Sequence, residues 1–474
     1  MKYRIKILFA FLVIQFCAVK VIDAKVLEVG KDSEYKNINT ALYASSNGDT
    51  IIINGGTYSG NFVISKSVSL IGKNNPVLNG NNSGTVLTIV SPSVKVEEII
   101  IKNSGKLLDK EDAGILVKAD SAVIKNNVLK SVLFGVYFLK ADYGVVEDNL
   151  VEGKKELDIP RRGDLFRAWY CKNLLLSSNQ FKYGRDVIIW FSENITIKNN
   201  NMSAARYGLH FMYNNDCKII HNIMTNNSVG MYLMYSKRIM VKNNLIAENR
   251  GASGFGAGLK DMDNVELKNN VIADNRVGIF NDNSPRSYDA HINYNGNVIA
   301  YNETGMEFMT SLENSDLVKN SFIENYQQTS LSSGQDARND YWEGNFWSDY
   351  SGYDINGDGF GEIPYKSKEM VESLLEDKPN LKIFLYSPAI NALNYAAESF
   401  PILMIEPKLI DKSPSVKPDY PAGIPKLKTQ KENGLFFLSF VLTIFVVLAL
   451  LLFAYKNKLV KNSLLKPQLV WRSR

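Results

Sequence analysis

Two stretches, YGLHFMYNNDCKIIHN at 207–222 and VGMYLMYSKRIMVKNN at 229–244, repeat one pattern at an offset of 22 residues. Gly208 aligns with Gly230, and Met212 aligns with Met234. A period near 22 leaves room for one short strand per copy but not for a pair of helices, which is typical of a stacked solenoid. A leucine-rich-repeat horseshoe would need a leucine-rich consensus, which the copies lack. The repeat therefore predicts an all-β chain folded as a right-handed parallel β-helix.

Asparagines recur along the chain with a similar spacing. One series has steps of 21 to 30 residues, and a second series begins five residues after one of its members. Because asparagine tolerates left-handed turns and can hydrogen-bond its own backbone, we expect both series in the stacked turns between strands. The first series is Asn127, Asn149, Asn179, Asn200, Asn222, Asn244, Asn270, Asn297 and Asn320, and the second is Asn227, Asn249, Asn275, Asn302 and Asn325.

Period-two alternation assigns the side chains to the inside or the outside of the coil. The first and third residues after each repeat glycine are apolar and should point inward, as Leu209 and Phe211 do. The second and fourth should point outward, so Met212 and Met234 become neighbours on rungs about 4.8 Å apart, with His210 on the same face. The outward pairs are Arg167/Trp169, Ile188/Trp190, His210/Met212, Tyr232/Met234, Gly258/Lys260, Phe280/Asp282 and Glu307/Met309.

This outward surface is unusually rich in tryptophan and methionine for a face in contact with water. An exposed apolar band of this kind usually marks a binding surface. A covering loop or the C-terminal tail would explain the same residues without any partner. We expect a partner-docking stripe made of Arg167, Trp169, Trp190, Tyr232, Lys260, Asp282 and Met309.

The N-terminal part begins with a segment outside the repeat. Residues 1–24 combine a basic start, an apolar run and a cleavage site with small residues, which predicts a signal peptide. Residues 25–366 then form the β-helix. Residues 35–50, with helical spacing of apolar residues before a turn, predict a cap over the first rung, whose edge and core would otherwise be open.

The repeat fades after Asn325, and residues 339–365 predict a C-terminal cap. Aromatic side chains in this stretch could close the open end of the coil: Tyr341, Trp342, Phe346, Trp347 and Tyr350.

The same cap contains part of a calcium-binding pattern. Asp354, Asn356 and Asp358, followed by Gly359, match the first half of a calcium loop. The twelfth position, where a bidentate Glu is expected, is Tyr365. The pattern is therefore compatible with a calcium site and equally with an ordinary Asp/Asn/Gly turn.

The C-terminal part predicts attachment to a membrane. Residues 367–434 are irregular and rich in proline, as in an arm or linker. Residues 435–455 carry no charge over 21 positions, enough for a transmembrane helix. The basic residues of 456–474 place that tail in the cytoplasm and the solenoid in the periplasm, anchored to the inner membrane.

Charge and motifs exclude several classes of function. The net charge of +5 comes largely from the C-terminal tail, so nucleic acid is not an expected partner. The sequence has no phosphate-binding glycine loop, no Ser-His-Asp arrangement and no C-x-x-C pair. Any ATP-driven step would therefore depend on a partner protein.

Several motifs resemble one known family. They are RGDLFRAWYCKN (162–173), GRDVIIWFSENI (184–195), RYGLHFMYNND (206–216), VGMYLMYS (229–236), GFGAGLKDMD (254–263), NDNSPRS (281–287) and the aromatic cap. With these motifs the region 35–366 resembles NosD, the periplasmic β-helix proteins of nitrous oxide reductase maturation in denitrification, whose rungs are known as PbH1 repeats. The membrane span departs from the soluble members of that family.

The resemblance implies a carrier or docking role rather than catalysis. It implies transient handling of copper as Cu(I), with or without sulfur. The implied partners are an ABC transporter of the NosF/NosY type, a NosL-type copper chaperone and nitrous oxide reductase itself. His210, Met212 and Met234 fall in the family's H-x-M-Y and L-M-Y motifs, and thioether and imidazole are soft ligands that suit Cu(I). These three residues are therefore the candidate copper ligands.

Two other functions remain open. Many β-helices are polysaccharide lyases or hydrolases, which need grouped carboxylates and basic residues for proton transfer. Asp164, Arg167, Arg185 and Asp186 could form such a group, beside tryptophans that could stack on sugars. The methionine column has no use in sugar chemistry. A purely structural surface protein would leave the tryptophan and methionine column unexplained.

Overall fold

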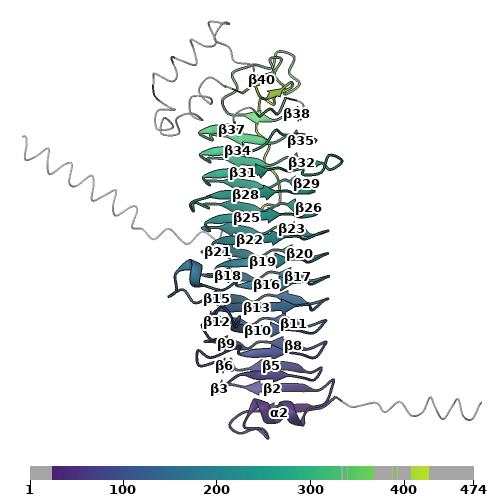
Figure 1. Ribbon diagram of the computed structural model, residues 1–474, viewed down its shortest axis with the longest axis vertical. Coiled ribbons are helices and arrows are strands. Elements are labelled where there is room, and N and C mark those ends of the chain that lie inside the picture. Colours follow the sequence, from purple (N-terminus) through teal and green to yellow (C-terminus); the bar gives the residue numbers. More distant parts are fainter. Residues whose placement is uncertain are drawn as a thin grey trace, which may run out of the picture. The chain divides into compact units, whose positions relative to one another are not determined.

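The computed structural model describes residues 24–332, 335–338, 340–367, 387, 392 and 407–425 of the 474-residue chain. These residues form an all-β, right-handed parallel β-solenoid of about 14 turns, which confirms the predicted fold (Figure 1). No helix among them is long and apolar enough to cross a bilayer. The predicted signal peptide, apart from Ala24, and the predicted membrane helix 435–455 lie outside the described residues.

Three parallel sheets form the walls of the solenoid. The 14-stranded sheet runs from β1 (Val26–Val29) to β38 (Tyr341–Glu343), and the 13-stranded sheet runs from β3 (Thr57–Ser59) to β39 (Phe346–Trp347). The 12-stranded sheet carries the candidate site residues. Its strands are β4 (Phe62–Ile64), β7 (Leu87–Ile89), β10 (Ala113–Val117), β13 (Phe134–Leu139), β16 (Phe166–Trp169), β19 (Asp186–Trp190), β22 (Tyr207–Met212), β25 (Val229–Met234), β28 (Phe255–Lys260), β31 (Val277–Asp282), β34 (Thr304–Phe308) and β37 (Gln327–Leu331).

The core runs along the axis of the coil, where inward side chains of successive rungs stack. Leu209 and Phe211 are fully buried, and so are their register partners Met231 and Leu233. The alternation expected from the sequence is therefore present in the structure. Because side chains alternate between the two faces of a strand, a shift of one residue would turn every one of these apolar groups toward water.

The asparagine series form two buried ladders. In the first, the backbone N–H of each asparagine donates to the side-chain Oδ1 of the next, at 2.8–3.0 Å. In the second, the corresponding bonds are 2.9–3.0 Å long. The expected bond to the local backbone is present, because Nδ2 of a ladder asparagine donates to the carbonyl two residues earlier, as Asn200 does to Lys198. The expected left-handed backbone is wrong, because it belongs to the preceding residue, as at Asn199 and His221. The ladder residues serve instead to pair buried polar groups that water cannot reach.

The first rung is covered by a short helix. The helix α2 (Ile38–Ala44) begins at Asn37, whose side chain accepts a hydrogen bond from the backbone N–H of Asn39. Ile38, Ala41 and Leu42 are buried against the first strands. The helix thus shields the apolar interior at the N-terminal end of the coil.

Aromatic rings close the opposite end. Trp347 is stacked between Phe322 and Tyr365, with ring centroids 4.2 Å apart on both sides. Trp342 is also buried. The expectation for Tyr341 was wrong, because it points outward at the start of β38 and is 54% exposed.

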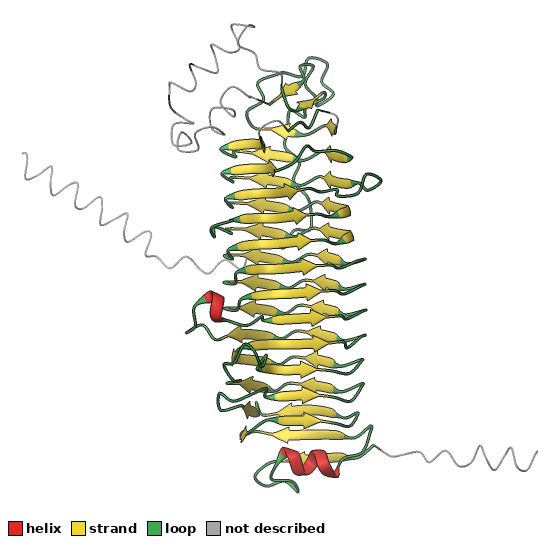
Figure 2. Cartoon of the chain, in the orientation of Figure 1, coloured by secondary structure: helices red, strands yellow, loops and turns green. Residues whose placement is uncertain are grey.

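The described part of the tail packs against the solenoid. The strand β41 (Ile410–Asp411) pairs antiparallel with β40 (Tyr365–Lys366) in the cap. Farther on, the backbone of Asp419 exchanges hydrogen bonds with the Ser321 hydroxyl, and the carbonyl of Gly423 contacts His221 at 3.1 Å. The tail therefore returns from the last rung toward the middle of the solenoid, as the ribbon in Figure 2 shows.

Candidate functional site

The register of the 12-stranded sheet brings the candidate copper residues together. Met212 of β22 is the register partner of Met234 of β25, so the two lie on adjacent rungs about 4.8 Å apart. His210 lies two residues before Met212 on the same outward side, about 6.6 Å along the strand. The rung before them contributes Trp190, which is the register partner of Met212.

Two outward columns cross the sheet at this point. We call the first the Trp–Met column. It consists of Trp169, Trp190, Met212, Met234, Lys260 and Asp282, with Met309 on the following rung. We call the second the His210 column. It consists of Arg167, Ile188, His210, Tyr232, Gly258, Phe280 and Glu307.

The two columns differ in their exposure to water. Trp190, Met212 and Met234 are partly exposed, and Met309 is 42% exposed. His210 and Arg167 are each only 6% exposed. The prediction of one continuous exposed stripe is therefore wrong for the N-terminal half of the His210 column. Rings, ion pairs and the loops that precede the strands cover those side chains.

The imidazole of His210 is held on several sides. The Trp190 ring meets it edge-to-face at 5.4 Å and 89°, and the Tyr207 ring does so at 4.9 Å and 87°. Its Nδ1 atom lies 3.4 Å from Oδ2 of Asp186. Its Nε2 atom is buried and has no hydrogen-bond partner. The indole Nε1 of Trp190 is also buried without a partner. That nitrogen can only donate a hydrogen bond, so Nε2 of His210 is the unpaired buried atom here that could bind a metal.

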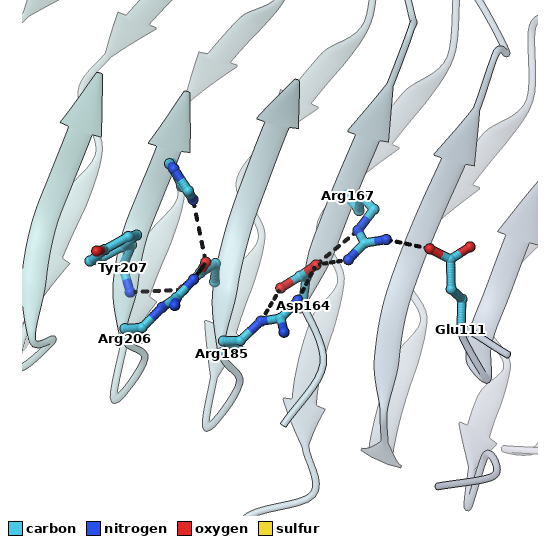
Figure 3. A network of polar contacts seen from close by, with 8 residues as sticks. Glu111, Asp164, Arg167, Arg185, Arg206 and Tyr207 are labelled. Carbon is cyan, nitrogen blue, oxygen red and sulfur yellow. Dashed lines mark hydrogen bonds and ion pairs between the residues drawn. The ribbon is translucent and has the colours of Figure 1, made fainter. Parts of the chain in front are cut away.

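A buried network of charges lies beside His210 (Figure 3). Asp164 accepts hydrogen bonds from Arg167 and Arg185, and Arg167 also pairs with Glu111 at 2.6 Å. One rung farther, Asp186 accepts from Arg206 Nε at 2.9 Å and from the backbone N–H of Tyr207 at 3.2 Å. Each buried carboxylate is therefore paired with at least one guanidinium group.

The pKa values of the two carboxyl groups are shifted in opposite directions. Burial raises the pKa of Asp164 against the attraction of Arg167 and Arg185. For Asp186 burial also favours the neutral form, but hydrogen bonds from His210 and Arg206 outweigh it and lower the pKa. Asp186 is thus the stronger candidate for a fixed negative charge beside His210.

The remaining residues of the expected docking stripe are placed as follows. Arg167 is not available to a partner, because its guanidinium is buried over the rings of Phe134 and Tyr137. Tyr232 packs edge-to-face between Tyr207 and Phe255. Lys260 and Asp282 are paired with each other. Trp169 packs against Trp190 at 5.3 Å, leaving both rings partly exposed.

An aromatic edge beside the Trp–Met column was missed in the sequence. It consists of Tyr170, Phe191, Tyr213 and Tyr235, whose rings stack at 4.8, 5.1 and 5.0 Å. All four have left-handed backbone, which is unusual for bulky residues. Each directly follows a residue of the Trp–Met column, so their spacing of 21, 22 and 22 residues could have revealed them.

The predicted calcium loop is held together by its own backbone. The carboxylate of Asp354 accepts from the N–H groups of Gly357, Asp358 and Gly359. Glu362, which the sequence comparison with calcium loops did not single out, accepts from the N–H of Ile355 at 2.9 Å. Calcium binding by this loop stays a prediction.

The chemistry of the donors decides which metal suits the outer face. Within the described ranges, no three side chains of His, Cys, Asp or Glu are grouped so that they could hold a metal ion. Cys171 and Cys217 are buried and form no disulfide, and burial raises their pKa to about 11 and about 12. A site on this face would therefore rely on the thioethers of Met212 and Met234 and on His210 Nε2, a donor set that fits Cu(I).

Comparisons with known proteins give the family. Residues 154–352 match the family described as "Periplasmic copper-binding protein (NosD)". The "Probable ABC transporter binding protein NosD" of Pseudomonas aeruginosa is 30% identical over 384 residues, which cover 77% of this chain and 86% of that protein. The protein of the same name from Stutzerimonas stutzeri is 32% identical over 131 residues, 27% of each chain.

Solved structures with a similar fold have much lower sequence identity to this chain. The A-module of the mannuronan C-5 epimerase AlgE4 from Azotobacter vinelandii is 13% identical, with a TM-score of 0.42 over 65% of this chain and 88% of that chain. A family 28 exopolygalacturonase from Yersinia enterocolitica is 8% identical, with a TM-score of 0.45 over 66% of this chain and 79% of that chain. These likenesses carry no functional argument. The match to the relative from Pseudomonas aeruginosa shows that the chain belongs to the NosD family.

Proposed function

We propose that this protein binds Cu(I) on the outer face of its 12-stranded sheet and delivers it for assembly of the copper site of nitrous oxide reductase. The ligands are the thioethers of Met212 and Met234 and the Nε2 of His210. The observation that carries the proposal is the combination of two methionines in register with a buried imidazole nitrogen that has no partner. The description of the family as periplasmic and copper-binding supports the same chemistry.

The partners follow from the family. The relatives are named as ABC transporter binding proteins, and this chain has no nucleotide-binding motif of its own. We therefore propose that it works in the periplasm beside a transporter of the NosF/NosY type, and that it receives copper from a NosL-type chaperone. In this proposal the segment 435–455 anchors the protein to the inner membrane near that transporter.

A docking role accounts for the residues around the metal ligands. Trp169, Trp190 and Met309 keep part of their surface open to solvent, and in the aromatic edge Tyr170 and Tyr213 are 51% and 47% exposed. Aromatic and methionine side chains are enriched in protein interfaces. A donor or acceptor protein that docked here would bring its own metal site next to Met212 and Met234.

The carbohydrate-enzyme alternative fits the structure less well. A lyase or hydrolase needs a carboxylate that is free to take or give a proton within reach of its substrate. Asp164 and Asp186 are fully buried; Asp164 is bound by the guanidinium groups of Arg167 and Arg185, and Asp186 by that of Arg206. Neither is placed to act on a sugar at the surface.

The direct test is a competition titration. The full chain in mild detergent would compete for Cu(I) against a chromophoric chelator under anaerobic conditions, beside the triple variant His210→Ala, Met212→Leu, Met234→Leu. The variant Met309→Leu is the control, because it changes an exposed methionine on a distant rung. We expect the wild type and the control to bind alike and the triple variant to lose binding.

The other outcomes are also decisive. Equal binding by all three proteins would place any copper site elsewhere. No binding by the wild type would end the carrier proposal and leave a scaffold on which partners exchange the metal. Circular dichroism of each variant would show that a loss of binding is not a loss of fold.

A further inference from the structure

Asp186 is placed to control the orientation of His210. It stands at the start of β19, and its register partner is Tyr207, three residues before His210 on the next strand. Its side chain is fully buried, and Oδ2 lies 3.4 Å from Nδ1 of His210. Arg206 and the backbone N–H of Tyr207 also bind the carboxylate, so Asp186 cannot easily turn away.

The imidazole ring has little freedom to rotate. Trp190 and Tyr207 both meet it edge-to-face, and these contacts fix the plane of the ring. Asp186 approaches from the beginning of the strands, whereas Met212 lies two residues toward their end. The nitrogen that Asp186 contacts is therefore on the side away from the methionines.

We propose that Asp186 is a positioning residue that holds the proton of His210 on Nδ1 and so presents Nε2 as the copper ligand. The inference rests on the proposed function, because it assigns a role within the same site. The physical reason is general. A carboxylate that accepts the N–H of a metal-binding histidine selects one tautomer, fixes the ring and makes the other nitrogen more basic. The unpartnered state of Nε2 in this structure is what such an arrangement would leave.

The neighbouring rung supplies a matched control. Asp164 is fully buried like Asp186 and is also paired with arginine, in its case with Arg167 and Arg185. Among the hydrogen bonds and ion pairs that the structure describes for Asp164, none reaches His210. Replacing either carboxylate by its amide removes one buried negative charge, but only the change at Asp186 removes the charged acceptor for His210.

The first readout is the tautomer of the apo protein. The chain has three histidines, so selective ¹⁵N-histidine labelling gives a simple spectrum, and His210→Ala assigns the signal. We expect the wild type to carry the proton on Nδ1, Asp186→Asn to show a mixture of tautomers, and Asp164→Asn to match the wild type. A wild-type proton on Nε2 would overturn the proposal without the use of any variant.

The second readout is Cu(I) affinity by the same competition titration. Removal of an outer partner of a metal ligand typically weakens binding roughly 10-fold to 100-fold, which is the loss we expect for Asp186→Asn. Asp164→Asn should bind like the wild type. If His210→Ala loses copper while Asp186→Asn keeps it, the positioning role alone is wrong. If His210→Ala binds like the wild type, the copper site itself is wrong, and the positioning role fails with it.

Discussion

The corner that holds the first asparagine ladder and the outer face of the 12-stranded sheet are built from the same repeat, but they use it in opposite ways. At the corner the same residue type returns on rung after rung, and its polar atoms are all paired. On the face the residue changes from one rung to the next. Along the Trp–Met column, two rungs with tryptophan are followed by two with methionine and then by lysine, aspartate and methionine.

This difference distinguishes residues that are required for folding from residues that are available for binding. A position that repeats is fixed by a requirement common to all rungs, which here is the pairing of buried backbone groups. A position that varies is free of that requirement. Residues that bind a partner or a metal are therefore to be sought among the varying positions, and His210, Met212 and Met234 are three of them.

The largest effect on stability should come from breaking the ladder at Asn200. Asn200→Ala leaves the backbone N–H of Asn179 and the carbonyl of Leu176 without their partners. We expect a loss of roughly 2–6 kcal/mol in the free energy of unfolding, from about 1–3 kcal/mol for each of the two buried groups that lose a partner. Urea denaturation followed by circular dichroism measures it, and Cu(I) affinity should not change.

The adjacent residue provides the control for this prediction. Asn201 lies on the outward side of its strand and is half-buried, and its Oδ1 is buried without a hydrogen-bond partner, so the side chain contributes no bond from that oxygen. Asn201→Ala should therefore change stability by less than about 0.5 kcal/mol. A similar loss for both variants would mean that the ladder is no more important to the fold than the face beside it.

An effect of similar size is expected where the ladder ends. Asn345 donates to Oδ2 of Asp411 from its backbone at 3.1 Å and from its side chain at 2.9 Å, and Trp347 Nε1 donates to the same oxygen at 3.2 Å. Asp411→Ala should cost roughly 2–6 kcal/mol, because the backbone N–H of Asn345 and Nε1 of Trp347 lose their acceptor, at about 1–3 kcal/mol for each. Asp411→Asn keeps an acceptor oxygen and should cost less. Hydrogen exchange in the cap would distinguish the two variants.

The same residue should make stability depend on pH. Burial raises the pKa of Asp411, so the folded state holds its proton more tightly than the unfolded state. Its contribution is fully present below the unfolded pKa and is lost as the pH rises through the folded pKa. Asp411→Asn should remove this decline, and thermal unfolding at a series of pH values would show it. An unchanged profile would mean that the carboxyl does not titrate with folding.

The smallest expected effect is a change in tryptophan fluorescence on the outer face of the 12-stranded sheet. Trp190 is the register partner of Met212 and packs on His210, so a bound cation would lie near its ring, within the range of about 6 Å for a cation–π contact. We expect Cu(I) to quench tryptophan fluorescence in the wild type and in Trp169→Phe, but much less in Trp190→Phe. Equal quenching in both variants would place the metal away from this rung.

The sequence was sufficient for the regular parts of the molecule. The alternation after Gly208 and Gly230 placed Leu209 and Phe211 inside, and it put Met212 beside Met234. These features follow from a period of 22 and an alternation of two, which the sequence displays directly.

Contacts that cross the repeat could not be predicted in this way. The burial of His210 depends on the rings of Trp190 and Tyr207 and on Asp186, which is 24 residues away. The end of the ladder at Asp411 lies 66 residues beyond Asn345, in a part of the chain without the repeat. No periodic pattern links such residues, so only the folded chain brings them together.

The central claim is that His210, Met212 and Met234 bind Cu(I) together. X-ray absorption at the copper edge of the Cu(I)-loaded full chain tests it most directly, because sulfur and nitrogen scatter at different distances. We expect two sulfur ligands and one imidazole in the wild type, and loss of the sulfur scattering in Met212→Leu, Met234→Leu. A copper ion surrounded only by nitrogen and oxygen, or an unchanged spectrum in that variant, would contradict the claim.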